Sequence, residues 1–299
     1  LSNEWGRLAQ GNHNNVPYTD TIDFITKAEV PTHKDVTYAQ FVLDYRPTKP
    51  DKHRTRITVG GNKFNYPSDP GSPTTDMLES KILINITISD ARKGSKFCCA
   101  DIRDMFLASP MDNPEYMKVL YHHFQTDIRK KYDLDNKVHS DGYIYIKIKK
   151  GMYGLKQAAL LANRYFIKNL EPHGDDPIQG TNDIWTHKTK NIFFCLCVDD
   201  FDIKYFDKKD DDHLIHALSQ NYKFSIDWTG NAYCGLSLDW NYTVGWIDIS
   251  MPNYIKKAIK KFQQTSKKYP QYSPHACTSY TPTQKSSYQR AIIEDKSPL

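Results

Sequence analysis

The feature that most constrains this chain is an apolar run that leads directly into two adjacent aspartates. Residues 192–198 read Ile-Phe-Phe-Cys-Leu-Cys-Val, Asp199 and Asp200 follow, and apolar-polar alternation resumes over 201–205. This pattern predicts a β-hairpin with two carboxylates at its turn. Adjacent carboxylates repel each other unless a cation or a basic group neutralises them, so the pair indicates a divalent-metal site. The alternative is an ordinary solvated turn, where Asp is common.

A third carboxylate occupies a similar place earlier in the chain. The apolar run 97–100 ends at Asp101, and Phe106 follows five residues later. The run predicts a strand that delivers Asp101 at its end, as the later run delivers the first pair. The alternative is that Asp101 caps a helix after the strand, a position that also suits Asp.

A glycine-bearing loop lies between the two acidic segments. Alternation over 143–149 predicts a strand, residues 151–159 read Gly-Met-Tyr-Gly-Leu-Lys-Gln-Ala-Ala, and a helix is expected up to about Leu170. Glycine permits a close backbone approach to a ligand. Lys156 and Gln157 at the start of the helix could hold a phosphate or a base.

The composition describes a globular chain with material for one large domain or two compact ones. Hydrophobic residues make up 39% of its 299 residues. No apolar run approaches the roughly 18 residues that a membrane span needs. The N-terminus lacks the basic region and apolar stretch of a signal peptide. Because the chain opens on Leu1, we expect it to be a segment of a longer protein.

The charge pattern favours a polyanionic partner more than the net charge of +5 does. Basic side chains crowd two segments, one with Arg46, Lys49, Lys52, Arg54, Arg56 and Lys63 and one with Lys256, Lys257, Lys260, Lys261, Lys267 and Lys268. Such clusters suit nucleic acid, although solvated loops and helix faces produce them too.

The six cysteines have no secretory context, so we expect reduced thiols. Zinc binding by Cys98-Cys99 or by Cys195 and Cys197 is the less favoured alternative.

Other elements follow from local patterns. Strands are expected over 36–45 and 55–59, and a helix that ends near Ser89 is expected to have Ser72 as its N-cap. A later helix is expected over 253–264. Its apolar residues, expected to face inward, are Ile255, Ala258, Ile259 and Phe262.

The order of these segments is more informative than any one of them. A strand ending in Asp101, a Gly-Lys-Gln loop, and a strand ending in Asp199 and Asp200 together describe a site for two-metal phosphoryl transfer. Magnesium prefers oxygen ligands and commonly uses one or two carboxylates plus substrate phosphates. Polymerisation of nucleotides is one reaction that uses this arrangement.

Four motifs, in this order, resemble the reverse transcriptase domain of copia-like (Pseudoviridae) long-terminal-repeat retrotransposons. They are Arg54-Thr-Arg-Ile-Thr-Val-Gly-Gly61; Ala100-Asp-Ile-Arg-Asp-Met-Phe-Leu107 with Met111-Asp112 and Glu115-Tyr116-Met117; Tyr153-Gly-Leu-Lys-Gln157; and Cys197-Val-Asp-Asp200. Downstream, the segments 233–239 and 251–257 resemble the primer-grip region and the start of the thumb. The resemblance covers about residues 1–265.

The resemblance implies an α+β fold of the right-hand polymerase type. Its fingers, its palm with an antiparallel sheet, and its partial thumb would divide the chain into several segments. These are an N-terminal lead at 1–36, fingers at 37–96 and 113–150, palm at 97–112 and 151–240, the start of the thumb at 241–265, and a linker or disordered tail at 266–299.

The resemblance also implies a metal site. Asp101, Asp199 and Asp200 match the catalytic, metal-binding triad of the palm, with the backbone carbonyl of Ile102 as a further ligand. The cofactor would be Mg²⁺ or Mn²⁺.

One residue departs from the family pattern, because Cys197 stands where a tyrosine is usual. That tyrosine packs near the primer end and binds no metal, so the change would affect fidelity or primer placement before chemistry.

The substrate-binding residues are implied in the same way. Phe106 matches the aromatic gate that would collide with a ribose 2′-hydroxyl and so favour dNTPs. Arg54 or Arg56 matches the fingers contact to the triphosphate. Gln157, with Lys156 nearby, matches the residue that touches the incoming nucleotide and template.

The implied function is RNA-directed DNA polymerase, a nucleotidyltransferase that extends a primer with dNTPs. The expected partners are an RNA or DNA template-primer, dNTPs, and the RNase H and integrase regions of the same polyprotein, with no membrane. The expected location is intracellular, in a cytoplasmic virus-like particle or in the nucleus.

Lys223 is a loose match to the acid that protonates pyrophosphate. The alternative functions are a catalytically decayed nucleic-acid-binding remnant and a structural domain of the same topology.

Overall fold

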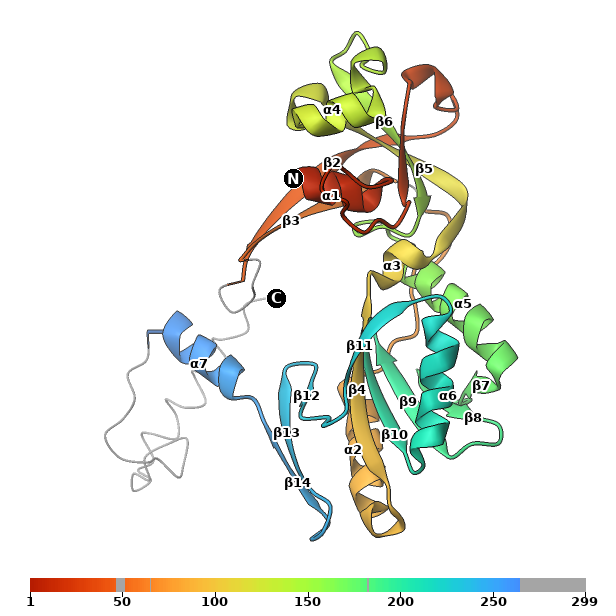
Figure 1. Ribbon diagram of the computed structural model, residues 1–299, viewed down its shortest axis with the longest axis vertical. Coiled ribbons are helices and arrows are strands. Elements are labelled where there is room, and N and C mark those ends of the chain that lie inside the picture. The colour runs from red at the N-terminus through yellow and green to blue at the C-terminus, as the bar shows by residue number, and fades with distance from the viewer. Residues whose placement is uncertain (47–51, 65, 182, 264–299) are drawn as a thin grey trace, which may run out of the picture. The chain divides into compact units, whose positions relative to one another are not determined.

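The computed structural model describes residues 1–46, 52–64, 66–181 and 183–263. The chain divides into two compact units, Leu1–Met251 and Pro252–Leu299. The first unit is an α+β structure. Its described residues form three sheets, in which every strand pairing except one is antiparallel. Figure 1 shows the elements with their labels.

The first sheet has five strands and is covered by two helices. In spatial order the strands are β1 (Ile22–Ile25), β6 (Tyr143–Lys150), β5 (Pro110–Leu120), β2 (Val36–Tyr45) and β3 (His53–Val59), and β2 and β5 form the parallel pair. The helices are α1 (Ser2–Leu8) and α4 (Thr126–Tyr132). Alternation places Ile144, Ile146 and Ile148 of β6 in the core, all fully buried.

Residues 1–36, expected to be a polar lead, supply a central part of this first core. Trp5 and Leu8 of α1 are fully buried, and the Trp5 ring lies 4.7 Å from that of Phe124 and 5.9 Å from that of Phe24. The apolar residues here are too few and too widely spaced for a periodic signal, so the sequence pattern alone did not indicate their burial.

The second sheet has six antiparallel strands. In spatial order they are β11 (Lys223–Asp227), β4 (Lys96–Arg103), β10 (Asp200–Tyr205), β9 (Ile192–Cys197), β8 (Ile184–His187) and β7 (Asp175–Pro177). The expected strand-turn-strand over 192–205 is therefore confirmed as β9 and β10. The long strand β4 extends beyond Asp101, so the helix-cap alternative for Asp101 is wrong.

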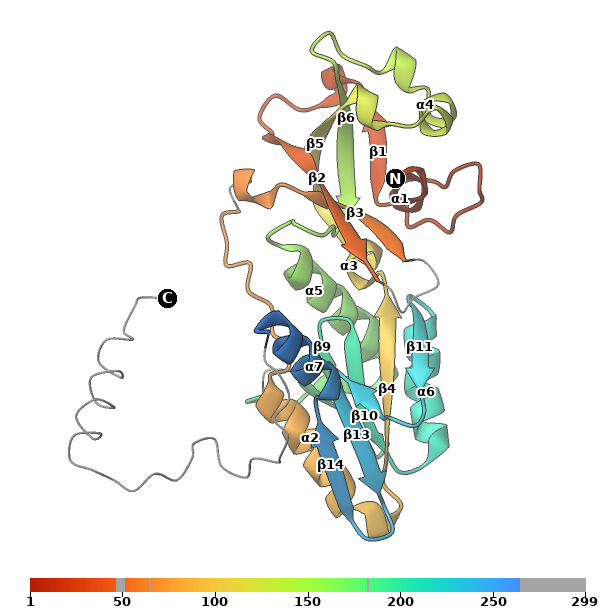
Figure 2. The ribbon, with the colours of Figure 1, turned by 90° about the vertical axis from the view of Figure 1, so that its left-hand side faces the viewer.

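Both faces of the second sheet are covered, as Figures 1 and 2 show. Helices α5 (Ala158–Leu170) and α6 (Lys208–Ser219) pack on one face with Phe194 and Phe201. Helix α2 (Met77–Ser89) and the small sheet β12 (Ala232–Tyr233), β13 (Leu236–Asn241) and β14 (Trp246–Ser250) contribute to the cluster on the other face. Cys99 and Cys195 are buried in that second cluster.

The start of helix α2 differs from the expected one, and an unexpected turn follows β4. Helix α2 begins at Met77, and its N-cap is Asp76 rather than Ser72, because Asp76 accepts the amide of Glu79 at 2.9 Å and forms a capping box with it. The short helix α3 (Met105–Ala108) follows β4 through Asp104, which has left-handed backbone angles. No local pattern in the sequence predicted this turn.

Helix α7 (Pro252–Lys261) belongs to the second unit. Ile255, Ile259 and Phe262 were expected to face inward, but they are 54%, 44% and 67% exposed. The predicted helix is confirmed, but the predicted burial of its apolar face is not. The expected tail at 266–299 lies outside the described residues.

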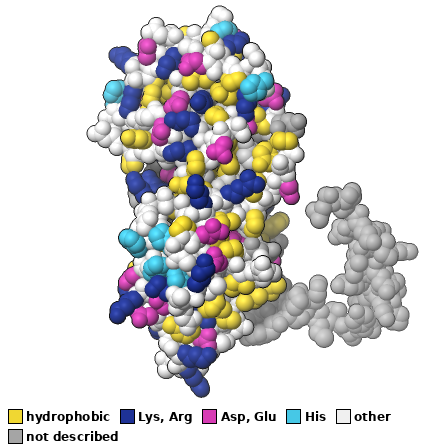
Figure 3. All heavy atoms as spheres, turned by 90° about the vertical axis from the view of Figure 1, so that its right-hand side faces the viewer, with side chains coloured by type: hydrophobic (Ala, Val, Ile, Leu, Met, Phe, Trp, Pro, Cys, Tyr) yellow, Lys and Arg dark blue, Asp and Glu magenta, His cyan; other side chains and the backbone are white. Residues whose placement is uncertain are grey.

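One face of the molecule carries mixed charge. On the face in Figure 3, basic and acidic side chains are interspersed, without a broad patch of one sign. None of the helices in the described ranges combines the length and the apolar content that crossing a membrane requires.

We predict that the Trp5→Ala variant loses about 3–5 kcal/mol of unfolding free energy, because it leaves a large cavity in the first core. Urea denaturation measures this loss. Tyr18→Ala is the matched control in the same segment, since Tyr18 is 60% exposed. Equal stability of the two variants would contradict the placement of residues 1–36 in the core.

Candidate functional site

The site begins with the register of two neighbouring strands. Strand β10 pairs with β4 so that Asp200 lies opposite Asp101. Directly opposed residues point to the same face, with Cβ atoms about 4.5–5.5 Å apart. Two carboxylates separated by 98 intervening positions in the sequence are thus neighbours in space.

The turn between β9 and β10 places Asp199 beside this pair. Val198 and Asp199 form the turn, and Val198 has a φ of +63°, which is uncommon for a β-branched residue. The backbone carbonyl of Asp199 accepts the amide of Ile102 at 2.8 Å, which fastens the turn to β4. A strained backbone that the surroundings hold in place is typical of functional sites.

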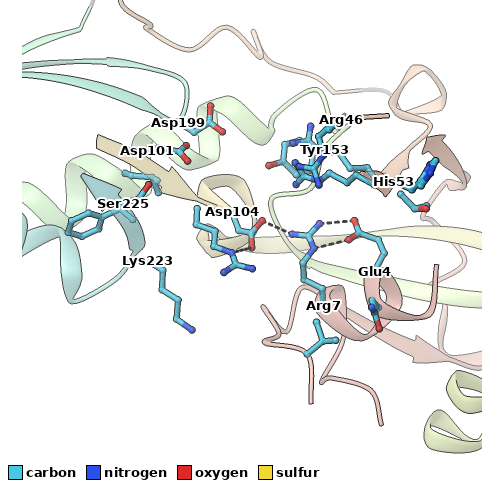
Figure 4. A pocket seen from close by; sticks show the side chains of 18 of the residues that line it. Glu4, Arg7, Arg46, His53, Asp101, Asp104, Tyr153, Asp199, Lys223 and Ser225 are labelled. Carbon is cyan, nitrogen blue, oxygen red and sulfur yellow. Dashed lines mark hydrogen bonds and ion pairs between the residues drawn. The ribbon is translucent and has the colours of Figure 1, made fainter. Parts of the chain in front are cut away.

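Asp101 and Asp199 line one cleft of about 990 Å³. Ile102 lines it too, and so does a ring of basic side chains: Arg46, Arg54, Arg56, Arg103 and Lys223. Figure 4 shows the two aspartates on one side of the cleft and Arg46 and Tyr153 on the other. A cleft with carboxylates at one end and several cations around it suits a ligand with both metal-binding and anionic groups.

The arginines of β3 lie in an electropositive environment. Burial and the neighbouring Arg56 and Arg7 lower the pKa of the Arg54 guanidinium. In the described ranges, neither Arg54 nor Arg56 has a carboxylate as an ion-pair partner. Like charges gathered without counterions are destabilising, so this part of the cleft favours an anion.

Asp200 faces away from the main cleft more than its neighbours do. Its Oδ2 contacts the Cys234 sulfur at 3.7 Å, and it does not line the cleft. Burial, together with the charges of Asp199 and Asp101, raises the pKa of Asp200. Part of this shift comes from mutual repulsion, which a cation between the carboxylates would relieve.

The carboxylate donors suit magnesium or manganese, although their side chains do not form a closed ligand set. Within the described ranges, no three His, Cys, Asp or Glu side chains are grouped closely enough to hold a metal ion. An open site of this kind suits an ion that completes its coordination with substrate phosphates and water. The expected carbonyl ligand at Ile102 stays a prediction.

A smaller cavity of about 210 Å³ is lined by one residue from each group, Asp199 and Arg56. Asp199, Phe106, Tyr153 and Arg56 line it together with Met105 and Val198. The Phe106 and Tyr153 rings meet edge-on at 5.4 Å, and the Arg56 guanidinium lies 5.0 Å from the centre of the Tyr153 ring. The structure therefore brings together the predicted gate, one predicted triphosphate contact and one predicted catalytic carboxylate.

The glycine loop contacts another strand instead of leaving space for a ligand. A Cβ on Gly154, which has a φ of +97°, would lie 2.1 Å from the carbonyl oxygen of Val59. A Cβ on Gly61 would lie 1.9 Å from the carbonyl oxygen of Gly154. The Val59 amide also donates to the Tyr153 carbonyl at 2.8 Å. The close approach expected of this loop is thus to β3, and it holds Tyr153 beside Arg56.

Lys156 and Gln157 lie apart from the two cavities. The Lys156 ammonium donates to the carbonyl of Phe64 at 2.8 Å. Gln157 is 5% exposed and donates to Glu115 at 3.4 Å, while its Oε1 has no hydrogen-bond partner. Neither side chain lines the cleft or the smaller cavity. Their role toward the nucleotide stays a prediction.

Several cleft residues were missed in the sequence analysis. Glu4, Arg7 and Asp104 line the cleft, joined by ion pairs, and Tyr153 lines both cavities. Glu4 and Arg7 lie three residues apart, a spacing that favours an ion pair on one face of a helix. This spacing could have indicated the short helix α1. Asp104 gave no signal of its own.

We predict that Gly154→Ala destabilises the protein by clearly more than the roughly 1–2 kcal/mol that a positive φ alone costs a non-glycine residue, because its methyl group would clash with Val59. Urea denaturation checks this. The matched control is Gly180→Ala, since Gly180 also has a positive φ, of +85°, but has nothing within 4 Å of the added Cβ. Similar losses in the two variants would remove the clash from the explanation.

No protein-family model matches the sequence. Among solved structures, the chain is similar to telomerase from Candida albicans, determined in complex with a TWJ fragment of telomeric RNA, with a TM-score of 0.39 and 10% sequence identity. The alignment covers 82% of this chain and 51% of the telomerase chain, so the chain spans about half the length of that protein.

Proposed function

We propose that this chain is the reverse transcriptase domain of a copia-like retrotransposon, an RNA-directed DNA polymerase that extends a primer with dNTPs. The observation that carries the proposal is the register that opposes Asp101 and Asp200, with Asp199 in the same arginine-lined cleft. In this proposal the first sheet belongs to the fingers, the second sheet to the palm, and residues 241–265 to the start of the thumb.

The carboxylates would hold the catalytic cations. Asp101 and Asp199 face the cleft, where they can share metal ions with the substrate, and Asp200 completes the negative charge behind them. When bound, two Mg²⁺ or Mn²⁺ ions lower the pKa of the attacking primer hydroxyl and neutralise charge on the leaving pyrophosphate. The protein's own part is to fix the carboxylates through the β4–β10 register and the Asp199–Ile102 hydrogen bond.

The basic side chains would bind the triphosphate. Arg56 lies in the same small cavity as Asp199, and its stacking on Tyr153 limits the positions that its guanidinium can take. This favours Arg56 over Arg54 as the first phosphate contact, with Arg54 adding positive charge behind it. Lys223 lines the cleft and is available to donate a proton to pyrophosphate.

Phe106 would select the sugar. Its ring lines the cavity between Asp199 and Arg56, where the sugar lies if the phosphates contact both ends. The edge-on contact with Tyr153 restricts rotation of the ring. An aromatic wall that cannot move aside would clash with a 2′-hydroxyl and admit a deoxyribose.

The wider setting follows from the proposed family. The template-primer would be RNA or DNA, and the RNase H and integrase regions would lie in the same polyprotein. The protein would act inside cells, in a cytoplasmic virus-like particle or in the nucleus. Cys197, which pairs with Asp200 across the hairpin, would alter the contact with the primer end.

We predict that Asp199→Asn lowers primer extension on poly(rA)-oligo(dT) by at least about 1,000-fold, because one charge that holds the cations is lost. Asp212→Asn is the matched control, on the exposed side of α6, and should retain activity. Chelation of divalent cations should abolish synthesis by the wild-type protein, and added Mg²⁺ should restore it.

The same assay separates the enzyme from its alternatives. Template-primer binding by the wild-type protein without synthesis would favour the decayed remnant. Absence of both would favour a structural domain. Full activity of the Asp199→Asn variant would reject the proposed site.

We predict that Phe106→Ala incorporates rNTPs, lowering the dNTP preference by roughly 10- to 100-fold, because the loss of the ring opens the cavity wall. Competition between dTTP and UTP in primer extension measures the preference. Phe106→Tyr keeps the ring and is the control. An unchanged preference in Phe106→Ala would remove Phe106 from the gate role.

A further inference from the structure

Arg7 forms a buried ion-pair network at the edge of the cleft. Its Nε and Nη2 donate to the two carboxylate oxygens of Glu4 at 2.8 and 2.7 Å, and its Nη1 donates to Asp104 at 2.6 Å. Figure 4 shows the guanidinium between the two carboxylates. Arg7 is 8% exposed. Unlike Arg54 and Arg56, it is engaged by carboxylates on two sides, so it is poorly placed to bind a phosphate.

The network connects three elements that are distant in the sequence. Arg7 and Glu4 belong to α1, and Asp104 joins β4 to α3. Glu4 Oε1 also accepts the backbone amide of Ile57 in β3 at 3.3 Å. One cluster of charges therefore ties the strand that carries Arg54 and Arg56 to the turn that follows Asp101.

Asp104 lies at a sensitive point of this turn. It has a φ of +57°, a left-handed conformation that Asp adopts more readily than most non-glycine residues. Phe106 stands two residues further along, and the carbonyl of Asp104 accepts the amide of Ala108 at 3.2 Å. The orientation of Asp104 therefore sets where α3 begins and where the Phe106 ring lies.

We propose that Arg7 is a positioning residue that sets the distance between the Phe106 gate and the arginines of β3, and so determines how tightly and how selectively the site holds a nucleotide. This inference rests on the proposed polymerase function and deepens it. Arg7 acts through Asp104 on one side and through Glu4 and Ile57 on the other. Its donors are engaged by Glu4 and Asp104, so in this proposal it acts through them and not by binding the nucleotide.

A planar guanidinium is required for this role. Arginine presents its donors in a rigid fork that can bind two carboxylates at once, whereas the lysine ammonium is a point charge on a flexible stem. Arg7→Lys keeps the charge and would hold one carboxylate well. Arg7→Met removes both contacts and leaves Glu4 and Asp104 without their common partner.

The kinetic test compares the two variants with the wild-type protein in primer extension. Arg7→Met is expected to raise the KM for dNTP by about tenfold or more while kcat changes by less than about threefold, the pattern of impaired substrate positioning. The preference for dNTP over rNTP should fall in the same variant. Arg7→Lys should lie between Arg7→Met and the wild type, and the affinity for template-primer should be unchanged in both.

The matched control is Lys149→Met. Lys149 in β6 also joins two carboxylates, those of Asp20 and Asp23, at 2.8 and 2.9 Å, but it lines neither cavity. A general loss of stability would affect both variants and would lower the fraction of active enzyme, seen in kcat. An unchanged KM and an unchanged sugar preference in Arg7→Met, with active wild-type enzyme, would overturn the inference.

Amide hydrogen exchange tests the inference independently of catalysis. Exchange across residues 104–109 should be faster in Arg7→Met and unchanged in Lys149→Met. Unchanged exchange in Arg7→Met would overturn the positioning role even if the wild-type protein proved inactive. Inactivity of the wild type with faster exchange in Arg7→Met would instead reject the proposed function and keep Arg7 as the residue that fixes this turn.

Discussion

The pairing of β4 with β10 is the constraint on which the site depends. Because side chains alternate along a strand, the register that opposes Asp101 to Asp200 also places Cys98 and Ile203 on the opposite face, where both are fully buried. A shift by one residue would turn the carboxylates toward the apolar cluster under α5 and α6 and move Cys98 and Ile203 out of it. The apolar core under α5 and α6 therefore fixes the position of the acidic groups, and the site is as stable as the sheet that carries it.

Opposite charges are separated across the cleft, and this separation requires support from the fold. The aspartates repel one another at one end, and the arginines of β3 repel one another at the other. A substrate that brings cations to the first group and phosphates to the second would relieve both repulsions. Backbone contacts between the glycine loop and β3 and the network around Arg7 help to hold the two groups in place.

The sequence was most informative where the pattern was strong and local. The hairpin around Asp199, the strand before Asp101 and the helix after Gln157 all follow from periodicity. The meeting of Asp101 with Asp200 depends on long-range pairing, which one sequence does not determine, and it was expected only through the order of motifs. The helix α1 and the left-handed turn at Asp104 were missed, because a seven-residue helix has too few positions to show a period and no local rule required a turn at Asp104.

The misplaced expectations have related causes. Ser72 and Asp76 are both good N-cap residues, and the choice between them depends on the capping box with Glu79 and on the packing of α2 over the sheet. The glycines of the 151–157 loop were expected near a ligand, but their small size serves contact between two backbones. In each case tertiary contacts selected one of several roles that the residue type allows.

The proposed site is tested most directly by whether one bound metal ion lies next to both acidic segments. Fe²⁺ substituted for Mg²⁺ in the presence of ascorbate and peroxide generates hydroxyl radicals that cut the backbone close to the ion, and mass spectrometry locates the cuts. We expect cuts near Asp101 and near Asp199, both suppressed by excess Mg²⁺. Cuts near only one of these residues, or cuts that Mg²⁺ does not suppress, would contradict the proposed site.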